Sequence, residues 1–337
     1  MMEKTTKNLK AFNTFAIDCT AEAYFEFTSK EELPQTAQIY AQYPKTHILG
    51  GGSNTVFLNN HISGAVIRIC NKGIETVEEN DRNVIVRVAA GESWEGFVRW
   101  ACKRGYCGIE NLAAIPGTVG AAPVQNIGAY GAQAEDSIAW VESFDMARQK
   151  FIQTKKEDCR FGYRNSRWKS ENKQELIHSV VFSLNKDFVP NTDYKALREY
   201  IERTSERNPT PERICEIVTE IRNSKLPDPK ILGNAGSFFK NPTVDKDEYE
   251  RLKSKFKDIV AFKERDGYKL SAAWLIESCG LKGKRFGNVG MHEKQALVMV
   301  NYGGATGKQI ADFALRVRQT VKDRFDVDLQ TEAHMVE

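Results

Sequence analysis

Hydrophobic positions along the chain follow both the two-residue repeat of strands and the 3.6-residue repeat of helices. Short or alternating apolar runs predict strands at residues 21–27, 47–49, 55–58, 84–90, 141–144, 151–154, 176–184 and 296–300, and shorter strand-like pieces around Leu329 and Met335. The run at 47–49 is expected to be buried. The pattern is ordinary for a chain that mixes strands and helices.

Helical patterns stand between these strands. Ser29, followed by two glutamates, is typical of a helix start. Residues 94–104 place Phe97, Val98, Ala101 and Cys102 on one face, and Gly105 follows as a stop signal. Further helices are predicted from about Asp193, after the cap formed by Thr210 and Pro211, and at residues 249–256, 272–276 and 308–325.

Composition narrows the class of protein. The 337 residues suit two or three domains, and 48 Lys and Arg nearly balance 45 Asp and Glu, so nucleic acid is not expected as a partner. No run reaches the roughly 18 apolar residues of a membrane span, and residues 1–10 lack a signal-peptide core. We therefore expect a cytoplasmic protein that binds no membrane. The seven scattered cysteines and five histidines show no metal-ligand spacing, so no metal site is expected.

Gly50, Gly51, Gly52, Ser53 and Asn54 separate two predicted strands. A dinucleotide fingerprint would need these glycines to open a helix, so the Rossmann fold is not indicated. Successive N–H groups in such a turn can bind a phosphate, but a plain hairpin loop has the same composition. The motif alone leaves both interpretations open.

Regular periodicity disappears between Cys107 and Gly131, where small residues dominate. A loop of this length inside a compact domain is usually functional or disordered, and this one carries too few charges for disorder. Small side chains and backbone N–H groups over so many positions suit an elongated cofactor that bears phosphates.

The stretch 225–242 presents a lone serine, Ser237, after two prolines and among glycines. Small residues allow close approach to a ligand, although a tight surface turn before the aromatic pair Phe238 and Phe239 is the alternative. Upstream, Arg164 follows an aromatic residue and a glycine, a setting that can hold a guanidinium against a carboxylate. An arginine in a loop is more often simply solvated.

Together these stretches resemble the UDP-N-acetylenolpyruvoylglucosamine reductase (MurB) family, flavin enzymes of the second committed step of peptidoglycan synthesis. The similarity covers nearly the whole chain in order, through residues 13–15, 50–54, 115–131, 159–166, 225–242, 295–301 and Glu332. Each motif alone is weak, but seven in the same order are specific. The departures are Gly51, where some members carry an acidic residue, and Gln330 and Thr331, where Glu and Pro are common.

The resemblance implies tightly bound FAD, NADPH as the hydride-donating co-substrate, and reduction of UDP-N-acetylglucosamine enolpyruvate to UDP-N-acetylmuramate. By similarity, the FAD contacts are Gly50, Gly51, Gly52, Ser53, Asn54, Ile115, Pro116, Gly117, Thr118, Gly120, Ala121, Ala122, Asn126, Gly128, Ala129 and Tyr130. The implied substrate contacts are Tyr194, Lys225, Asn241 and Gln295.

Three residues carry the implied chemistry: Ser237 donates a proton, Glu332 assists, and Arg164 stabilises the enolate. Hydride addition to the vinyl carbon leaves negative charge beside the carboxylate, which calls for cations and a proton source. A serine is a poor acid and needs a neighbouring cation or hydrogen-bond network, for which Lys225 is the candidate.

The implied fold class is α+β. A two-domain FAD-binding unit of the vanillyl-alcohol-oxidase (PCMH) type would comprise residues 1–70, completed by 324–337, and residues 71–227. A C-terminal α+β substrate-binding domain would comprise residues 228–323. The segment at Tyr194 suggests the longer, type I form, and a monomer is expected. The alternatives are a flavin-dependent oxidase of the same superfamily and a non-catalytic UDP-sugar-binding protein.

Overall fold

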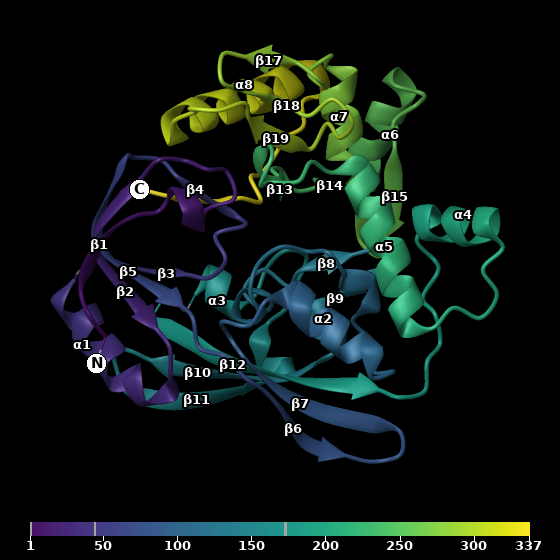
Figure 1. Ribbon diagram of the computed structural model, residues 1–337. Helices are drawn as coiled ribbons and strands as arrows, with labels where there is room; N and C mark the ends of the chain where they lie inside the picture. The colour runs from purple at the N-terminus through teal and green to yellow at the C-terminus, as the bar shows by residue number, and fades with distance from the viewer. Residues whose placement is uncertain (1, 44, 172–173) are drawn as a thin grey trace. The chain divides into compact units, whose positions relative to one another are not determined.

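The computed structural model describes residues 2–43, 45–171 and 174–337 (Figure 1). The chain forms two compact units, and neither is one continuous segment. The first unit comprises Met1–Lys7, Ala21–Gly51 and Ser63–Ser224, and the second comprises Asn8–Thr20, Gly52–Ile62 and Lys225–Glu337. The three-domain division expected from the sequence stays a prediction.

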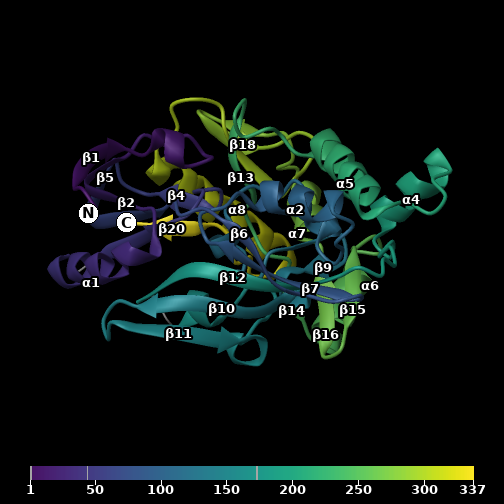
Figure 2. The ribbon, with the colours of Figure 1, turned by 60° about the horizontal axis from the view of Figure 1, so that its bottom comes forward.

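A sheet in the first unit has the strand order β1-β2-β5-β3. Its strands are β1 (Thr5–Asn8), β2 (Thr20–Phe27), β5 (His61–Ile69) and β3 (Thr46–Leu49). Helix α1 (Leu33–Gln42) lies beside this sheet (Figure 2) and shares its hydrophobic core. Ser29 and Glu32 form a capping box at the 3₁₀ turn Lys30–Glu32 that leads into α1, which confirms the predicted helix start.

The predicted strand at 47–49 exists as β3, but the expectation that it is buried was wrong. β3 stands at the edge of its sheet and pairs only with β5, in parallel. Ile48 is therefore 36% exposed, and only Leu49 of this strand is buried. Three apolar residues in a row cannot distinguish an edge strand from a central one.

An antiparallel sheet with the order β11-β10-β12-β7-β6 forms the rest of the first unit's framework. The strands are β6 (Ile74–Glu79), β7 (Asn83–Ala89), β10 (Ile138–Asp145), β11 (Lys150–Lys155) and β12 (Glu175–Asn185). Helix α2 (Trp94–Lys103) packs on this sheet (Figure 1), with the rings of Phe97 and Phe182 4.8 Å apart. The predicted strands and helix in this region are confirmed.

The long small-residue stretch contains little regular structure, as predicted. It holds the 3₁₀ turns Glu110–Leu112 and Val119–Ala121 and the two-residue strand β8 (Gly128–Ala129), which pairs with β9 (Ala132–Gln133). The 3₁₀ turns Ala134–Asp136 and Lys156–Cys159 and the short helix α3 (Arg167–Ser170) come next. Helices α4 (Lys195–Thr204) and α5 (Pro211–Lys225) complete the unit, and the Thr210 hydroxyl caps α5 as predicted.

The second unit contains a sheet with the order β13-β19-β18-β17. Its strands are β13 (Gly233–Ser237), β17 (Arg285–Phe286), β18 (Val289–Met291) and β19 (Val298–Asn301). Helices α7 (Ala272–Ser278) and α8 (Gly307–Phe325) contact each other, and α8 also contacts β18. A smaller sheet of β14 (Thr243–Val244), β16 (Gly267–Leu270) and β15 (Ala261–Glu264) lies with α6 (Lys246–Lys255).

The C-terminal strand β20 (His334–Val336) pairs in parallel with β4 (Thr55–Phe57). The glycine turn between β3 and β4 is consequently not a hairpin loop, because the two strands have different partners. The strand-like piece predicted around Leu329 is not a strand; only Thr331 nearby forms an isolated bridge, with Phe239. The 3₁₀ turn Lys10–Phe12 precedes the Asn13–Phe15 motif in the same unit.

Candidate active site

Two glycine-containing turns of the first unit touch through their backbones. A Cβ on Gly51 would lie 2.9 Å from Gly117 Cα, and a Cβ on Gly50 would lie 2.6 Å from Thr118 Oγ1. The second turn is itself fixed by hydrogen bonds from Trp94 N to Gly117 O (3.1 Å) and from Val119 N to Glu92 O (2.9 Å). Side chains at the glycines would force these turns apart, so the close approach requires glycine.

The two turns leave several hydrogen-bonding groups unused. Among the residues that the structure describes, the backbone N–H groups of Gly50, Gly51, Gly117 and Thr118 make no hydrogen bond. The Thr118 hydroxyl is also buried without a partner in the described chain. A cluster of free N–H groups and a buried hydroxyl is suited to an anion such as a pyrophosphate. These residues therefore fit the phosphates of FAD.

In other residues of the long loop, the backbone N–H groups are already used in hydrogen bonds within the chain. The N–H groups of Gly120, Ala121, Ala122 and Asn126 donate to backbone carbonyls, for example from Gly120 N to Ala90 O at 2.8 Å. Contacts of these residues with a cofactor would use other atoms. Their bonds hold the loop in the shape that presents Gly117 and Thr118.

The end of the loop is held in left-handed backbone conformations at Asn126 (φ 44°) and Tyr130 (φ 49°). The Asn126 side chain stabilises this shape, since it donates to Glu135 Oε1 (2.8 Å) and accepts from Glu135 N (3.0 Å). The Tyr130 ring contacts the Tyr194 ring edge-on at 5.0 Å. Two predicted ligand contacts from distant parts of the chain thus meet in the first unit.

Arg164 belongs to the same part of the first unit. Its own backbone is left-handed (φ 53°), and its guanidinium donates to the carbonyls of Gly128 (2.5 Å) and Asn126 (3.5 Å). These bonds anchor Arg164 against the loop that carries Gly128 and Tyr130. The alternative of a freely solvated loop arginine is therefore wrong.

Sequence reasoning missed a second arginine, Arg222. It lies on α5, and its Nε donates to the carbonyl of Ala114 at 3.2 Å. Burial lowers the pKa of Arg222, and the charge of Arg164 lowers that pKa further, while Tyr130 and Glu95 oppose the change. The available signal was its spacing of four residues from the buried Val218, which puts a charge beside the apolar face of a helix.

In the second unit, Ser237 ends β13 at an irregularity in the strand pairing. Ser237 pairs with Val298, and the register shifts between Asn234 and Ser237. Gly236 has φ +68°, and its N–H donates to Asn234 Oδ1 at 2.9 Å. A bulge of this kind re-aims the next side chain. The serine is thus presented by a strand, and the tight surface turn considered from the sequence is wrong.

Glu332 lies beside this strand end although it is far away in sequence. Glu332 N donates to Phe238 O at 2.8 Å, and Lys240 N donates to Gln330 O at 2.9 Å. Phe238 and Phe239 are both buried and fix this segment. The pairing brings Glu332 next to the residue that follows Ser237.

The second half of the glycine turn joins the same region of the second unit. A Cβ on Gly52 (φ +62°) would lie 2.0 Å from Phe12 O, and Gly52 O accepts from Thr14 N at 3.2 Å. Asn54, which follows Ser53, donates from Nδ2 to Glu332 O at 3.1 Å. Gly52, Ser53 and Asn54 therefore lie near Glu332, while Gly50 and Gly51 belong to the first unit.

The remaining predicted substrate contacts are distributed over the second unit. Lys225 is the last residue of α5 and is exposed. Asn241 Oδ1 accepts from Ala272 N at 3.0 Å and so supports the start of α7. Gln295 Oε1 accepts from Leu297 N at 3.3 Å in the turn before β19. Tyr194, by contrast, belongs to the first unit.

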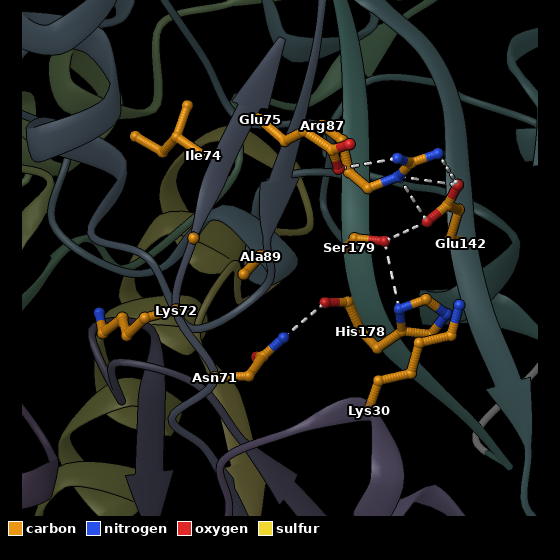
Figure 3. A pocket seen from close by; sticks show the side chains of 11 residues that line it. Lys30, Asn71, Lys72, Ile74, Glu75, Arg87, Ala89, Glu142, His178 and Ser179 are labelled. Atoms are coloured by element: carbon orange, nitrogen blue, oxygen red, sulfur yellow. Dashed lines mark hydrogen bonds and ion pairs between the residues drawn. The ribbon is translucent and has the colours of Figure 1, made fainter. Parts of the chain in front are cut away.

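A separate polar pocket lies on the antiparallel sheet of the first unit (Figure 3). It contains none of the predicted site residues; its lining is Lys30, Asn71, Lys72, Gly73, Ile74, Glu75, Arg87, Ala89, Glu142, His178 and Ser179. Burial lowers the pKa of His178 from 6.5 to about 4. A neutral histidine at pH 7 and the ion pair between Arg87 and Glu142 indicate a structural polar cluster.

The described residues contain no group of three or more His, Cys, Asp or Glu side chains placed to hold a metal ion. All seven cysteines are free thiols, and burial raises the pKa of the Cys107 thiol to about 11. None of the helices in the described ranges is long and apolar enough to cross a membrane.

Two family profiles match the sequence. Residues 21–153 match the FAD binding domain, and residues 228–336 match the C-terminal domain of UDP-N-acetylenolpyruvoylglucosamine reductase. The first match includes Gly50, Gly51, Gly117 and Thr118, and the second includes Ser237 and Glu332. The fold class is accordingly an FAD-binding part joined to that C-terminal domain.

Whole-length relatives agree with both profiles. The protein named UDP-N-acetylenolpyruvoylglucosamine reductase in Polynucleobacter asymbioticus is 41% identical to this chain, and the alignment covers 99% of this chain and 97% of the relative. The protein of the same name in Pseudomonas aeruginosa is 39% identical, and the alignment covers 97% of each chain. The crystal structure of the reductase (MurB) from Thermus caldophilus has the same fold, with a TM-score of 0.69 at 24% identity and full coverage of both chains. The chain therefore belongs to the UDP-N-acetylenolpyruvoylglucosamine reductase family.

Proposed function

We propose that the chain is an FAD-dependent reductase that uses NADPH to convert UDP-N-acetylglucosamine enolpyruvate into UDP-N-acetylmuramate, a step of peptidoglycan precursor synthesis. The observation that carries the proposal is the pairing of the Glu332 segment with Phe238, which sets Glu332 beside the strand end that presents Ser237. Membership of the reductase family supports the same conclusion.

FAD, when bound, supplies the hydride chemistry between NADPH and the vinyl carbon. The N–H groups of Gly50, Gly51, Gly117 and Thr118 would hold its phosphates, because they make no hydrogen bond in the described chain and belong to two turns that touch. The Thr118 hydroxyl would add one further hydrogen bond.

Ser237 would then give the proton of its Oγ to the carbon next to the substrate carboxylate. The bulge at Gly236, held by Asn234, orients that hydroxyl. Glu332 would assist this proton transfer, and Lys225 is the cation proposed to make the resulting alkoxide tolerable. Arg164, fixed by the Gly128 and Asn126 carbonyls, would stabilise the negative charge of the enolate.

Finer assignments belong to the same proposal. Tyr194, Asn241 and Gln295 would contact the UDP-sugar, and the Tyr194 segment before α5 supports the type I form of the family. We propose that the protein acts as a monomer in the cytoplasm. Its buried free thiols are compatible with a reducing compartment, and light scattering would test the monomer.

The decisive experiment is an anaerobic absorbance titration of the purified protein. NADPH is added first, then UDP-N-acetylglucosamine enolpyruvate, while the flavin band is followed. Bleaching by NADPH and prompt recovery with the enolpyruvyl sugar would establish both half-reactions. Recovery only with oxygen would favour the oxidase, and a protein that cannot be loaded with FAD would refute the proposal.

A further inference from the structure

Tyr194, a proposed substrate contact, lies in a segment that has no regular structure of its own. The described residues 186–194 connect β12 to α4 without forming a helix or a strand. Tyr194 is 48% exposed and makes an edge-on contact with the Tyr130 ring at 5.0 Å. An exposed ring on a connecting segment keeps one position only where other residues fasten that segment.

The Asn111 side chain fastens this segment to the end of the long loop. Its Nδ2 donates to the carbonyl of Asn191 at 2.9 Å and to the carbonyl of Tyr130 at 2.8 Å. Both hydrogens of the amide group are thereby used, one for each segment. A single side chain therefore joins the two stretches of backbone that carry the tyrosine rings.

Asn191 adds a second connection in the opposite direction. Its Nδ2 donates to the carbonyl of Gly131 at 3.2 Å, and its Oδ1 accepts from Asp193 N at 3.4 Å. The first of these bonds reaches the residue that follows Tyr130. The segment before Tyr194 is thus tied to the loop by two asparagines.

Asn111 itself stands on a buried base. It is 1% exposed and lies in the 3₁₀ turn Glu110–Leu112. The buried Trp94 side chain donates from Nε1 to the carbonyl of Leu112 at 2.9 Å, which ties this turn to α2. Asn111 is therefore the fixed end of the connection, and the exposed segment is the end that it holds.

The other half of the Asn111 amide shows that its donors matter. Asn111 Oδ1 is buried and accepts no hydrogen bond within the described chain. A buried acceptor without a partner costs free energy, so overall stability alone does not favour an asparagine at this position. A flipped amide would be worse, since it would set Oδ1 against two carbonyl oxygens. The two donated bonds are thus what this residue contributes.

We propose that Asn111 is a positioning residue for substrate binding, which acts through Asn191 to hold Tyr194 where it meets the UDP-sugar. This inference rests on the proposed function, in which Tyr194 is a substrate contact. Without the Asn111 bonds, Tyr194 occupies its binding position for only part of the time. The apparent Kd of the substrate then rises in proportion, while the rate with saturating substrate stays the same, because bound substrate restores the position.

The competing explanation is that Asn111 only holds Tyr130 and so supports the FAD site. Two variants separate the explanations. Asn111→Leu keeps the approximate size of the side chain and removes both donors. Asn191→Ala acts at the exposed end: it removes the bond to the Gly131 carbonyl and leaves the bond from Asn111 to Tyr130 in place.

Asn71→Leu is the matched control. Asn71 is another buried asparagine of the first unit, and its side chain also joins two backbone groups, the His178 carbonyl and the Gly91 N–H. It has no hydrogen bond to residues 186–194. Loss of a buried amide in general is thereby separated from loss of the connection to Tyr194.

Two quantities are measured on the FAD-loaded protein: the Kd of UDP-N-acetylglucosamine enolpyruvate, from the change in the oxidised flavin spectrum, and the flavin reoxidation rate at saturating substrate. We expect Asn111→Leu to raise the Kd about tenfold, the equivalent of about one hydrogen bond, and Asn191→Ala to raise it about threefold. The saturated reoxidation rate should be unchanged in both variants. Asn71→Leu should change neither quantity.

A double-mutant cycle shows whether the effect passes through Tyr194. Tyr194→Ala alone should raise the Kd, and the addition of Asn111→Leu should raise it no further. Hydrogen exchange of residues 186–194 should also be faster in Asn111→Leu than in the wild type, in protein without substrate.

The outcomes are distinct. Wild-type Kd values in Asn111→Leu and Asn191→Ala overturn the proposal, as does a rise of equal size with and without the Tyr194 ring. Wild-type binding by Tyr194→Ala overturns it too. If Asn111→Leu loses FAD or does not fold, Asn191→Ala decides alone, by the same Kd and the same cycle with Tyr194→Ala. Failure of the proposed function would instead appear in the wild type, as a flavin that the enolpyruvyl sugar does not reoxidise, while the faster hydrogen exchange would still be seen.

Discussion

Protonation of His178 should make the first unit less stable as the pH falls. His178 lies in β12 and is only 6% exposed, with its Nδ1 3.2 Å from the Ser179 hydroxyl (Figure 3). Burial is the main cause of its lowered pKa, about 4 instead of 6.5; Lys30 and Arg87 add to the effect, and Glu142 opposes it. The folded protein therefore holds this imidazole neutral where the unfolded chain protonates it.

The sign and size follow from the two pKa values. Because the unfolded chain binds the proton more tightly, the stability from neutral His178 is complete above pH 6.5 and is lost as the pH falls toward 4. A difference of about 2.5 between the pKa values corresponds to about 3 kcal/mol when fully expressed. At pH 5 the expected loss is about 2 kcal/mol.

Urea unfolding at pH 7.5 and pH 5.0 measures this loss. Tryptophan fluorescence reports mainly the first unit, which holds Trp94, Trp100, Trp140 and Trp168. The wild type should lose about 2 kcal/mol more than His178→Gln between the two pH values. His61→Gln, which changes an exposed histidine, should behave like the wild type. Equal pH dependence of the wild type and His178→Gln would refute the reasoning.

Three further variants test the site. Gly51→Ala places a methyl group 2.9 Å from Gly117 Cα. Because overpacking costs about 1–3 kcal/mol, this variant should bind FAD about ten- to a hundredfold more weakly in equilibrium dialysis. In the control Gly162→Ala, the added methyl group has no other atom within 4 Å, so this variant should bind FAD normally. Ser237→Ala should leave flavin reduction by NADPH near normal but slow reoxidation by the enolpyruvyl sugar by about 10²- to 10⁴-fold in stopped-flow absorbance, and equal losses in both half-reactions would argue against a proton donor. Asn234→Ala removes the acceptor of the Gly236 N–H and should lower the free energy of unfolding by about 1–3 kcal/mol. Flavin reoxidation should also become slower, because Ser237 loses its orientation. An unchanged reoxidation rate would show that the bulge is not needed to orient Ser237.

Most helix limits were predictable from the sequence because their signals are local. The helix predicted at 94–104 is α2 (Trp94–Lys103), and the one predicted at 308–325 is α8 (Gly307–Phe325). Ser93 caps the first and Thr306 the second, each through a side chain that lies within one turn of the helix. Caps and apolar spacing act over a few residues, so the neighbouring residues in the sequence are sufficient to predict where a helix begins and ends.

The errors concern properties that depend on distant partners. The burial of β3 depends on which strands flank it, and β3 proved to be an edge strand. The structure around Ser237 depends on β19, about sixty residues later, so a run of glycines looked like a turn. Arg222 was not singled out from the sequence, because its contact with the Ala114 carbonyl joins residues that are far apart along the chain.

The sequence by itself determined the order of the elements, the family, and the residue types that a hydride transfer and a proton transfer require. Only the tertiary structure decided that Glu332 lies beside the Ser237 strand end, that the Gly51 and Gly117 turns touch, and that Arg222 donates to the carbonyl of Ala114. The physical reason is the separation along the chain between the residues that interact. Periodicity and capping are set by neighbours along the chain, whereas strand pairing, close backbone approach and charge compensation are set by residues that meet only when the chain has folded.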